Sequence, residues 1–333
     1  MNLQRIAIIG AGGWGTALAA LWAKQDKKIT LWGHNPERIE RIKTTRENPD
    51  YLAGAKLSSS IAVTSDLALC AEADLIVFVT PSTALREIAQ KLRGIVMSKD
   101  VMLLSCTKGI EHGSGLRMSE ILGQAFPDNR VAVLSGPNLA VEVSRGLPTA
   151  TVIGCPQPDV AASLQQHLGS SRFRIYTSDE VTGIELGGAL KNIFAIAAGV
   201  SDGFGLGDNS KSALVTRALA ELLRLGTAMG GKPTTFYGLS GAGDLIATCF
   251  SAHSRNRRVG DRLGRGESLG EITSTMKTVA EGIPTTKSAF ACARKLGMET
   301  PIIDQVYAVL YEGKPPPQAL QDLLERDQKA ERI

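Results

Sequence analysis

One lysine stands out among the residues that could do chemistry. Lys191 is the only charged side chain between Glu185 and Asp202, in the run ELGGALKNIFAIAAGVSD. Burying an unpaired ammonium costs several kcal/mol, roughly, so a lysine in such a helix needs a partner or a task. A lysine whose pKa is lowered by burial or by a like charge can donate a proton at neutral pH. Two interpretations stay open: a general acid, and half of a buried ion pair with Glu185 or Asp244.

Three further residues are candidates to work with Lys191. Lys108 follows the apolar run VMLLSCT, at the carboxyl end of an expected strand, where ligands bind in open α/β sheets. If both lysines face one cleft, each lowers the pKa of the other. Gly187 lies one helical turn before Lys191 on the same face, so its missing side chain is expected to leave room for a ligand. Asp244, in an expected glycine loop (GLSGAGD), is a candidate to orient a lysine or a substrate hydroxyl.

A glycine motif near the start predicts a nucleotide site. The sequence GAGGWG begins at Gly10, directly after the strand-like RIAIIG and before the helix-like TALAALWA. In this context Gly10 allows a tight turn, Gly12 lets a pyrophosphate approach the backbone, and Gly15 permits close helix–strand packing. The free N–H groups at the helix start then bind the diphosphate of a dinucleotide.

The end of the second expected strand bears on the choice of nicotinamide cofactor. NAD-specific proteins usually carry Asp or Glu there to hold the ribose 2′-hydroxyl. Here the sequence is LWGHN, with no acid before Glu37. A 2′-phosphate would meet His34 or Arg38 instead, which favours NADP(H) or dual use of NADP(H) and NAD(H) over strict NAD.

A basic segment indicates a phosphate site. SRNRR, from Ser254 to Arg258, places arginines beside a capping serine at an expected helix start. Arginine side chains and helix N–H groups both bind phosphate, from the substrate or from the cofactor. A solvated basic turn is the alternative. No aromatic residues interleave and the net charge is only +4, so a nucleic-acid partner is not expected.

The elements that must position these residues fall into two regions. Apolar strand-like runs alternate with helical patterns up to about residue 178, which predicts a Rossmann-like, doubly wound, mostly parallel sheet. Beyond it the pattern is helical throughout, which predicts an all-helical domain. We place the domains at 1–185 and 186–333. Strands are expected at 5–10, 28–33, 74–80, 101–107, 131–136, 151–155 and 173–176, and later helices at 179–200, 210–229, 254–264, 284–297, 301–312 and 316–326.

The cysteines and the N-terminal stretch indicate the redox environment and the cellular location of the protein. The five cysteines are scattered and form no CxxC or Cys/His cluster, so reduced thiols are expected, with no disulfide framework and no metal site. The uncharged stretch 6–23 superficially matches a signal peptide, but its glycine spacing has its own mechanical meaning. The protein is expected to be cytoplasmic, without membrane insertion.

Taken together, these motifs resemble bacterial-type NAD(P)-dependent glycerol-3-phosphate dehydrogenase. The matching stretches occur in the family's order and cover most of the chain: GAGGWGTALA (10–19), LWGHNPE (31–37), TKG (107–109), SGPNLAVE (135–142), GLPTA (146–150), ELGGALKNIFAIAAGVSDG (185–203), GLSGAGDL (238–245), SRNRRVG (254–260) and VAEGIPTT (279–286).

The resemblance implies interconversion of dihydroxyacetone phosphate and sn-glycerol 3-phosphate by a homodimer, with Lys191 as the proton donor and acceptor, assisted by Lys108 and Asp244. It further implies contacts to the substrate from Lys108, Gly136, Asn138, Lys191, Asp244, Ser254, Arg255 and Asn256. Implied cofactor contacts are Gly10, Gly12, Gly13, Trp14, Gly15, His34, Lys108, Ala140, Arg255, Val279 and Glu281. Many relatives have a hydroxyl residue at the position of Asn138. A serine is common at the position of Gly13, and Gly13 itself can offer only its backbone N–H.

Two rival interpretations remain. A 3-hydroxyacid or 6-phosphogluconate-type dehydrogenase would explain Gly187 and Lys191, but makes less of SRNRR and GAGD. A non-catalytic NADPH-binding module would bind the cofactor without turnover.

Overall fold

The computed structural model describes residues 3–96, 98–328 and 330–331. The chain divides into two compact units. The first comprises residues 1–108 and 117–181, and the second comprises 109–116 and 182–333. The short segment 109–116 therefore leaves the first unit and returns to it, and its Ile110 belongs to the core of the second.

The first unit is built on an eight-stranded sheet in the order β10-β9-β8-β7-β6-β1-β2-β5. All neighbouring strands in this sheet are parallel except β8 and β9, which run antiparallel. The strands are β1 (Arg5–Ile9), β2 (Lys28–Trp32), β5 (Ala62–Thr64), β6 (Leu75–Phe78), β7 (Met102–Ser105), β8 (Val131–Ser135), β9 (Thr149–Gly154) and β10 (Phe173–Ser178), with β3 (Glu47–Asn48) and β4 (Leu52–Lys56) forming a separate hairpin.

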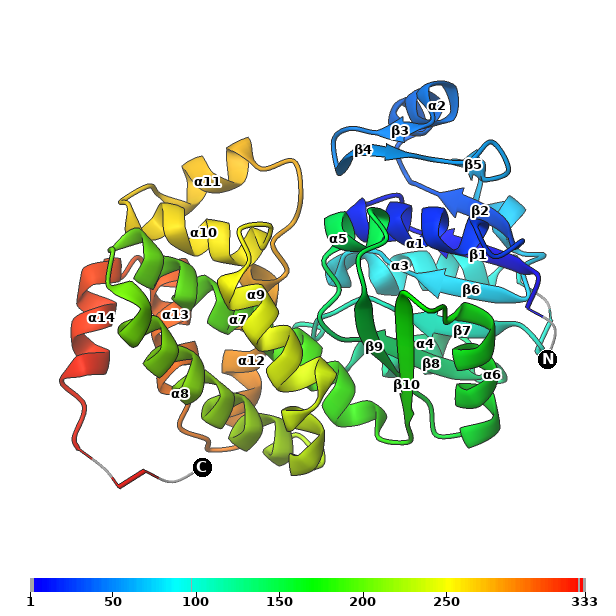
Figure 1. Ribbon diagram of the computed structural model, residues 1–333. Helices are drawn as coiled ribbons and strands as arrows, with labels where there is room; N and C mark the ends of the chain where they lie inside the picture. The colour runs from blue at the N-terminus through cyan, green and yellow to red at the C-terminus, as the bar shows by residue number, and fades with distance from the viewer. Residues whose placement is uncertain (1–2, 97, 329, 332–333) are drawn as a thin grey trace. The chain divides into compact units, whose positions relative to one another are not determined.

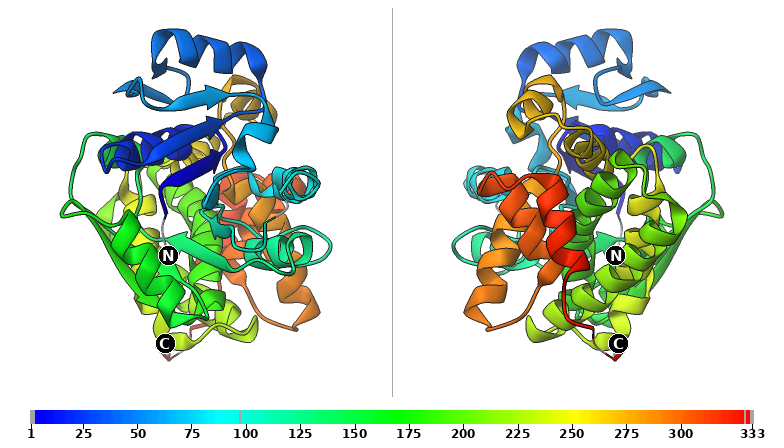
Figure 2. Two further views of the ribbon diagram at one scale, coloured as in Figure 1. Left: turned by 90° about the vertical axis from the view of Figure 1, so that its right-hand side faces the viewer. Right: turned by 90° about the vertical axis from the view of Figure 1, so that its left-hand side faces the viewer.

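Helices cover both faces of this sheet (Figures 1 and 2). The helices of this unit are α1 (Gly13–Ala23), α2 (Pro36–Thr45), η1 (Leu67–Cys70), η2 (Ser82–Ala84), α3 (Leu85–Arg93), α4 (Met118–Ala125), α5 (Ala140–Ser144) and α6 (Pro158–Leu168). Helices α1 and α6 pack on one face and α3 and α4 on the other, which explains why the central strands β6 and β7 are buried along their whole length. The predicted doubly wound, mostly parallel sheet is confirmed.

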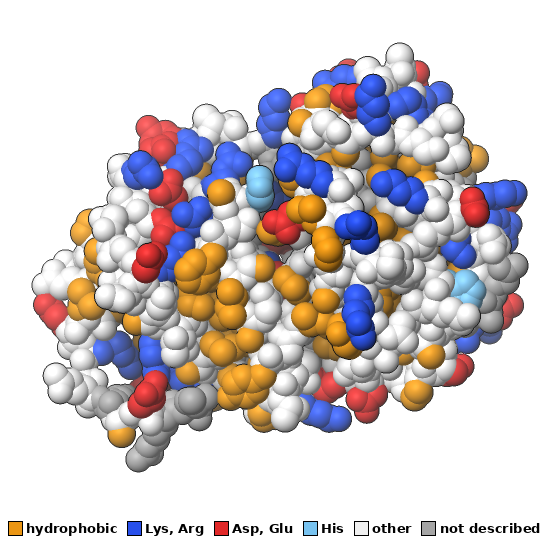
Figure 3. Space-filling model, viewed as in Figure 1, with side chains coloured by type: hydrophobic (Ala, Val, Ile, Leu, Met, Phe, Trp, Pro, Cys, Tyr) orange, Lys and Arg blue, Asp and Glu red, His pale blue; other side chains and the backbone are white. Residues whose placement is uncertain are grey.

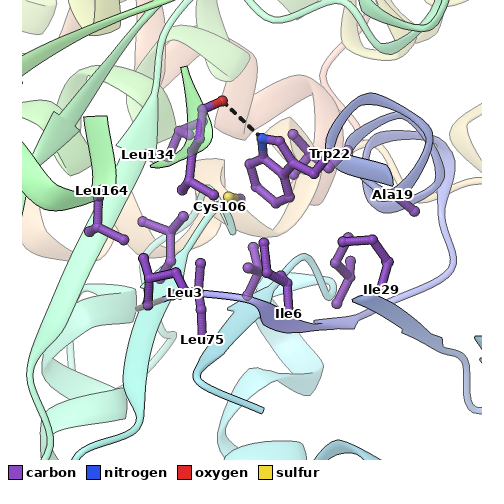
Figure 4. Close-up of a cluster of buried hydrophobic side chains, with 14 of the residues drawn as sticks. Leu3, Ile6, Ala19, Trp22, Ile29, Leu75, Cys106, Leu134 and Leu164 are labelled. Carbon is purple, nitrogen blue, oxygen red and sulfur yellow. Dashed lines mark hydrogen bonds between the residues drawn. The ribbon is translucent and has the colours of Figure 1, made fainter. Parts of the chain in front are cut away.

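A buried polar link in the first unit holds α1 against α6. The Trp22 indole is fully buried, and its Nε1–H donates to the carbonyl oxygen of Leu168 at 3.1 Å (Figure 4). Because a buried indole N–H costs free energy when it has no acceptor, this bond sets where α1 lies along α6.

The second unit is helical, as predicted. Its elements are α7 (Val181–Gly203), α8 (Gly207–Ala228), η3 (Pro233–Tyr237), η4 (Leu239–Gly243), α9 (Asp244–Phe250), α10 (Arg255–Gly264), α11 (Leu269–Thr275), α12 (Gly282–Lys295), α13 (Pro301–Tyr311) and α14 (Pro316–Leu324). Helix α14 packs against α13 (Figure 2).

Helix α7 forms the centre of the second unit. It is long and apolar enough to cross a membrane by length and composition, but 89% of its most apolar window is buried inside the protein. A helix that is apolar on all sides is typical of a position surrounded by other helices. Its neighbours complete the unit's core with side chains such as Phe236, Leu245 and Val259.

Candidate functional site

The glycine turn of the first unit has the geometry that a diphosphate requires. Gly10 has φ +128°, and a Cβ there would lie 2.5 Å from the carbonyl oxygen of Val79. A Cβ on Gly15 would lie 1.9 Å from the carbonyl oxygen of Gly10. Gly12, by contrast, is the N-cap of α1 and has no atom within 4 Å of its Cβ position. The turn thus leaves open backbone at the start of α1, next to the N–H groups of the first helical turn.

Two neighbours of this turn can contribute only through their backbone. A Cβ on Gly13 would lie 2.8 Å from the carbonyl oxygen of Tyr51, so a side chain does not fit there. The same position is 3.9 Å from the Cβ of Ala140, which places the start of α5 beside the turn. The Trp14 ring packs against Phe173, with ring centroids 6.4 Å apart, and so faces the core.

The end of β2 carries an exposed histidine and a helix cap. His34 is exposed, and the Asn35 side chain accepts a hydrogen bond from the backbone N–H of Arg38 at 2.8 Å. The Arg38 guanidinium lies over the Tyr51 ring, 4.6 Å from its centroid, and 3.9 Å from the Asp50 carboxylate. Arg38 therefore already has a carboxylate nearby, and His34 is the more accessible candidate for a 2′-phosphate.

Lys108 lies three residues after β7, as its position in the sequence predicts. Its Nζ donates to the carbonyl oxygen of Gly136, after the neighbouring strand β8, at 3.1 Å. Asn138 follows closely, and its Nδ2 donates to Thr151 Oγ1 at 3.0 Å. Asn138 Oδ1 is buried and has no hydrogen-bond partner among the described residues. The carboxyl ends of β7 and β8 thus bring Lys108, Gly136 and Asn138 together.

In the second unit, Lys191 is buried in a three-residue network. It is 6% exposed, and its Nζ lies 3.0 Å from Asp244 Oδ1 and donates to Thr248 Oγ1 at 2.6 Å. Thr248 Oγ1 in turn lies 3.1 Å from Asp244 Oδ1. We call Lys191, Asp244 and Thr248 the lysine triad. The sequence left open whether Lys191 is a general acid or half of a buried ion pair. The structure shows the ion pair, with Asp244, and this pairing is compatible with a role as a general acid.

Thr248 was missed by sequence reasoning. It lies four residues after Asp244 on α9, so both side chains point from one face of that helix. This spacing becomes informative only once the segment is known to be helical. Burial raises the pKa of the thiol of the next residue, Cys249, to about 12, which favours the protonated thiol at neutral pH.

Two expectations about this region were wrong. The segment GLSGAGD is not a loop, because Leu239–Gly243 forms the π-helical turn η4 and Asp244 begins α9. Nor does Gly187 leave room for a ligand. A Cβ on Gly187 would lie 2.9 Å from the carbonyl oxygen of Ser240, so the backbone of η4 fills that space. The glycine instead lets η4 approach α7, which brings Asp244 to Lys191.

The start of α10 is organised by a cap and an amide bridge. Ser254 is the predicted N-cap, and its Oγ accepts from the Arg257 N–H at 3.2 Å. Asn256 is buried; its Nδ2 donates to Asn192 Oδ1 at 2.8 Å, and its Oδ1 accepts from the Gly282 N–H at 2.9 Å. Since Asn192 follows Lys191 on α7, this bridge joins the start of α10 to the helix of the lysine triad.

The remaining candidates lie near this bridge or on the surface. Arg255 is exposed at the first position of α10. Glu281 precedes Gly282 at the start of α12, beside the Asn256 amide. Val279 is 47% exposed. No group of three or more His, Cys, Asp or Glu side chains that could hold a metal occurs within the described ranges.

Comparison with known proteins decides the family. The model of the NAD-dependent glycerol-3-phosphate dehydrogenase N-terminus matches residues 5–161, and that of the C-terminus matches residues 180–321. The chain belongs to this family.

Full-length relatives agree. The chain is 46% identical over 333 residues to glycerol-3-phosphate dehydrogenase [NAD(P)+] of Chlorobium luteolum, covering 99% of this chain and 100% of that protein. It is 45% identical to the enzyme of the same description from Geobacter metallireducens, covering 99% of each. The crystal structure of glycerol-3-phosphate dehydrogenase from Coxiella burnetii superposes with a TM-score of 0.94 at 38% identity, covering 97% of this chain and 99% of that one.

Membership confirms the prediction of an NAD(P)-dependent oxidoreductase of the glycerol-3-phosphate dehydrogenase family. The rival interpretations, a 3-hydroxyacid or 6-phosphogluconate-type dehydrogenase and a non-catalytic NADPH-binding module, are thereby set aside.

The fit of Gly187 against η4 gives the first testable prediction. In Gly187→Ala, the new Cβ would meet the Ser240 carbonyl oxygen at 2.9 Å, and η4 must move away from α7. We expect kcat to fall by about tenfold to a hundredfold, because Asp244 moves with η4 away from Lys191. Gly270→Ala in α11 is the matched control, since only Ser268 Oγ, at 4.0 Å, lies near its Cβ position. Steady-state rates and melting temperatures of both variants check this; wild-type turnover in Gly187→Ala would contradict it.

Proposed function

We propose that the lysine triad is the proton-transfer site of this glycerol-3-phosphate dehydrogenase. The overall reaction is dihydroxyacetone phosphate + NAD(P)H + H⁺ to sn-glycerol 3-phosphate + NAD(P)⁺. A proton must reach the C2 oxygen as the carbonyl carbon accepts hydride. Lys191 is the donor of that proton, and Asp244 and Thr248 hold its Nζ in place. The observation that carries this proposal is the buried Lys191–Asp244 pair at 3.0 Å, with Thr248 as the third member.

The first unit is proposed to hold the nicotinamide cofactor, which supplies the hydride when bound. The open backbone at Gly12 fits a diphosphate, with N–H groups from Gly13, Trp14 and Gly15 and the close turn at Gly10. Ala140 borders the turn, and Lys108 lies at the carboxyl end of β7, where both cofactor and substrate are expected. We propose that the ranges expected from the sequence, 1–185 and 186–333, serve mainly cofactor binding and mainly substrate binding and catalysis, respectively. The compact units divide the chain slightly differently, with 109–116 and 182–185 in the second unit.

The start of α10 is proposed to hold the substrate phosphate. A helix N-terminus with a serine cap and an adjacent arginine offers N–H donors, a favourable dipole and a guanidinium to a dianion. Ser254, Arg255 and Asn256 supply these groups, and Arg255 is also proposed to reach the cofactor, together with Val279 and Glu281. On the first unit, Lys108, Gly136 and Asn138 are the proposed substrate contacts, with the unpartnered Asn138 Oδ1 as an acceptor for a substrate hydroxyl. The product would supply the backbone of glycerophospholipids.

Replacing the proton donor tests the central proposal. In Lys191→Met we expect kcat with dihydroxyacetone phosphate to fall by about a thousandfold, because the general acid that donates the proton is lost. Binding of NADPH, followed by its fluorescence, should be retained. Lys295→Met removes the same charge from an exposed position on α12 and should keep full activity. Near-normal turnover in Lys191→Met would overturn the assignment.

The lack of an acid at the end of β2 supports use of NADP(H) at least as well as NAD(H). In His34→Asp, the carboxylate would accept a hydrogen bond from a ribose 2′-hydroxyl and repel a 2′-phosphate. We expect the ratio of kcat/KM for NADPH to that for NADH to fall by roughly tenfold or more. His112→Asp, at another exposed histidine, is the control and should leave the ratio unchanged. Equal effects in the two variants would count against His34 as the selecting residue.

We also propose that the protein is a homodimer in the cytoplasm and does not insert into a membrane. Hydrophobic side chains gather on the surface over α8 and α9 (Figure 3). Ile246 and Phe250 of α9 are 53% and 47% exposed, and Tyr237 of η3 is 54% exposed. Contiguous exposed apolar side chains are typical of an interface between subunits. Sedimentation equilibrium should give twice the chain mass; a monomer at micromolar concentration would exclude this proposal.

A further inference from the structure

A second charged network lies in the helical unit, outside the lysine triad. Asp202, near the end of α7, accepts hydrogen bonds from Lys211 Nζ at 2.9 Å on each of its oxygens. It also accepts from Arg257 Nε at 2.5 Å. The Lys211 side chain is only 7% exposed, and Asp202 is the carboxylate that compensates its charge.

This network contacts both ends of the segment from Phe250 to Arg257, which joins α9 to α10. The Lys211 ammonium lies over the ring of Phe250, the last residue of α9, 4.7 Å from its centroid. Arg257 lies in the first turn of α10. Between these two residues lies Ser254, and next to it Arg255 and Asn256. The segment is therefore held at one end by the cation–π contact of Phe250 with Lys211 and at the other by the ion pair of Arg257 with Asp202. Lys211 and Asp202 are themselves paired.

The backbone of α7 comes unusually close to α10 at the same place. A Cβ on Gly199 would lie 1.9 Å from the carbonyl oxygen of Arg257, and a Cβ on Gly260 would lie 1.9 Å from that of Ile196. Glycine costs about 1 kcal/mol relative to alanine inside a helix, so its presence on both helices has a packing reason. The close approach brings Asp202 within reach of Arg257.

Arg257 differs from Arg255 and Arg258 in its exposure and in its pairing with Asp202. The sequence alone offers Arg255, Arg257 and Arg258 equally as phosphate ligands. In the structure the Arg257 guanidinium is committed to Asp202, whereas Arg255 and Arg258 are exposed.

We propose that Asp202, with Lys211, is a positioning residue for the phosphate site: it holds the start of α10 at a fixed place relative to Lys191, which lies three helical turns before it on α7. This inference rests on the proposed function, which places the substrate phosphate at Ser254, Arg255 and Asn256. Asp202 acts through Arg257 and touches no reacting atom.

Two substrates separate positioning from general damage. Dihydroxyacetone lacks the phosphate and so uses Lys191 without using the start of α10. In Asp202→Asn we expect kcat/KM for dihydroxyacetone phosphate to fall by about tenfold or more, mainly through KM. The kcat/KM for dihydroxyacetone, measured at high concentration, should be unchanged, so the ratio of the two should fall.

The control is Asp261→Asn. Asp261 lies on α10 and pairs with Arg265 at 3.1 Å on the surface, so the variant loses the same charge and also one ion pair. Removing a negative charge by itself strengthens phosphate binding. A fall of the ratio in Asp202→Asn but not in Asp261→Asn therefore reports geometry and supports the inference.

Two results would overturn it. The first is an unchanged ratio, either because kcat/KM falls equally for both substrates, which indicates a merely structural role, or because neither value changes. The second is a raised ratio, which is expected if the released Arg257 binds phosphate directly. If Asp202→Asn does not fold because Lys211 is left without its carboxylate, the double variant Asp202→Asn/Lys211→Met removes both charges, and the same criteria apply. Arg255→Met separates this inference from the proposed function: an unchanged ratio there rejects the phosphate site itself, whereas a fall there without a fall in Asp202→Asn rejects only the positioning role.

Discussion

The buried pair between Lys191 and Asp244 is the constraint on which the helical unit depends. Their side chains are 7% and 4% exposed, and two charges removed from water repay their desolvation only when the geometry and the remaining hydrogen bonds are good. Thr248 supplies one of those bonds. The pair therefore requires α7 and α9 to lie at a fixed separation, and the surroundings of α7 to stay dry. Its almost wholly apolar sequence follows from that requirement.

Close backbone contacts meet this requirement. Gly187 admits the π-helical turn η4 against α7, and Gly199 and Gly260 admit α10 against the same helix. These contacts hold α9 and α10 close to α7, so side chains from the first turns of α9 and α10 reach side chains of α7. Asp244 begins α9, and Asn256 lies in the first turn of α10, so both reach α7 by the same device. The glycines of α7 therefore act on the site indirectly, because they allow η4 and α10 to pack close to α7.

How much the sequence reveals depends on whether a feature is local. The strands of the main sheet with continuous apolar runs were predicted, because burial on both faces leaves a pattern within each strand. The short β3, β4 and β5 have no such run and were missed. Lys191 was identified by its isolation in an apolar helix. Its partner Thr248 could not be identified, since a threonine at position i+4 carries meaning only if the segment is helical, and glycine-rich GLSGAGD has low helix propensity. There, contact with α7 overrides local preference.

The sites proposed for the two units differ in the kind of atom that they use, which explains why their signals in the sequence differ. At the glycine turn the groups offered are backbone N–H donors, so the sequence records only where side chains must be absent. At the lysine triad the proposed proton transfer requires side chains whose chemistry cannot be exchanged, because a proton donor must titrate and its partners must accept hydrogen bonds. The glycine turn is therefore recognised in the sequence by the spacing of its glycines. The lysine triad is recognised by the single charge of Lys191 in an apolar helix. Asp202 belongs to neither kind. It sits at the polar end of α7 and becomes visible only when the helices that it joins are seen in contact.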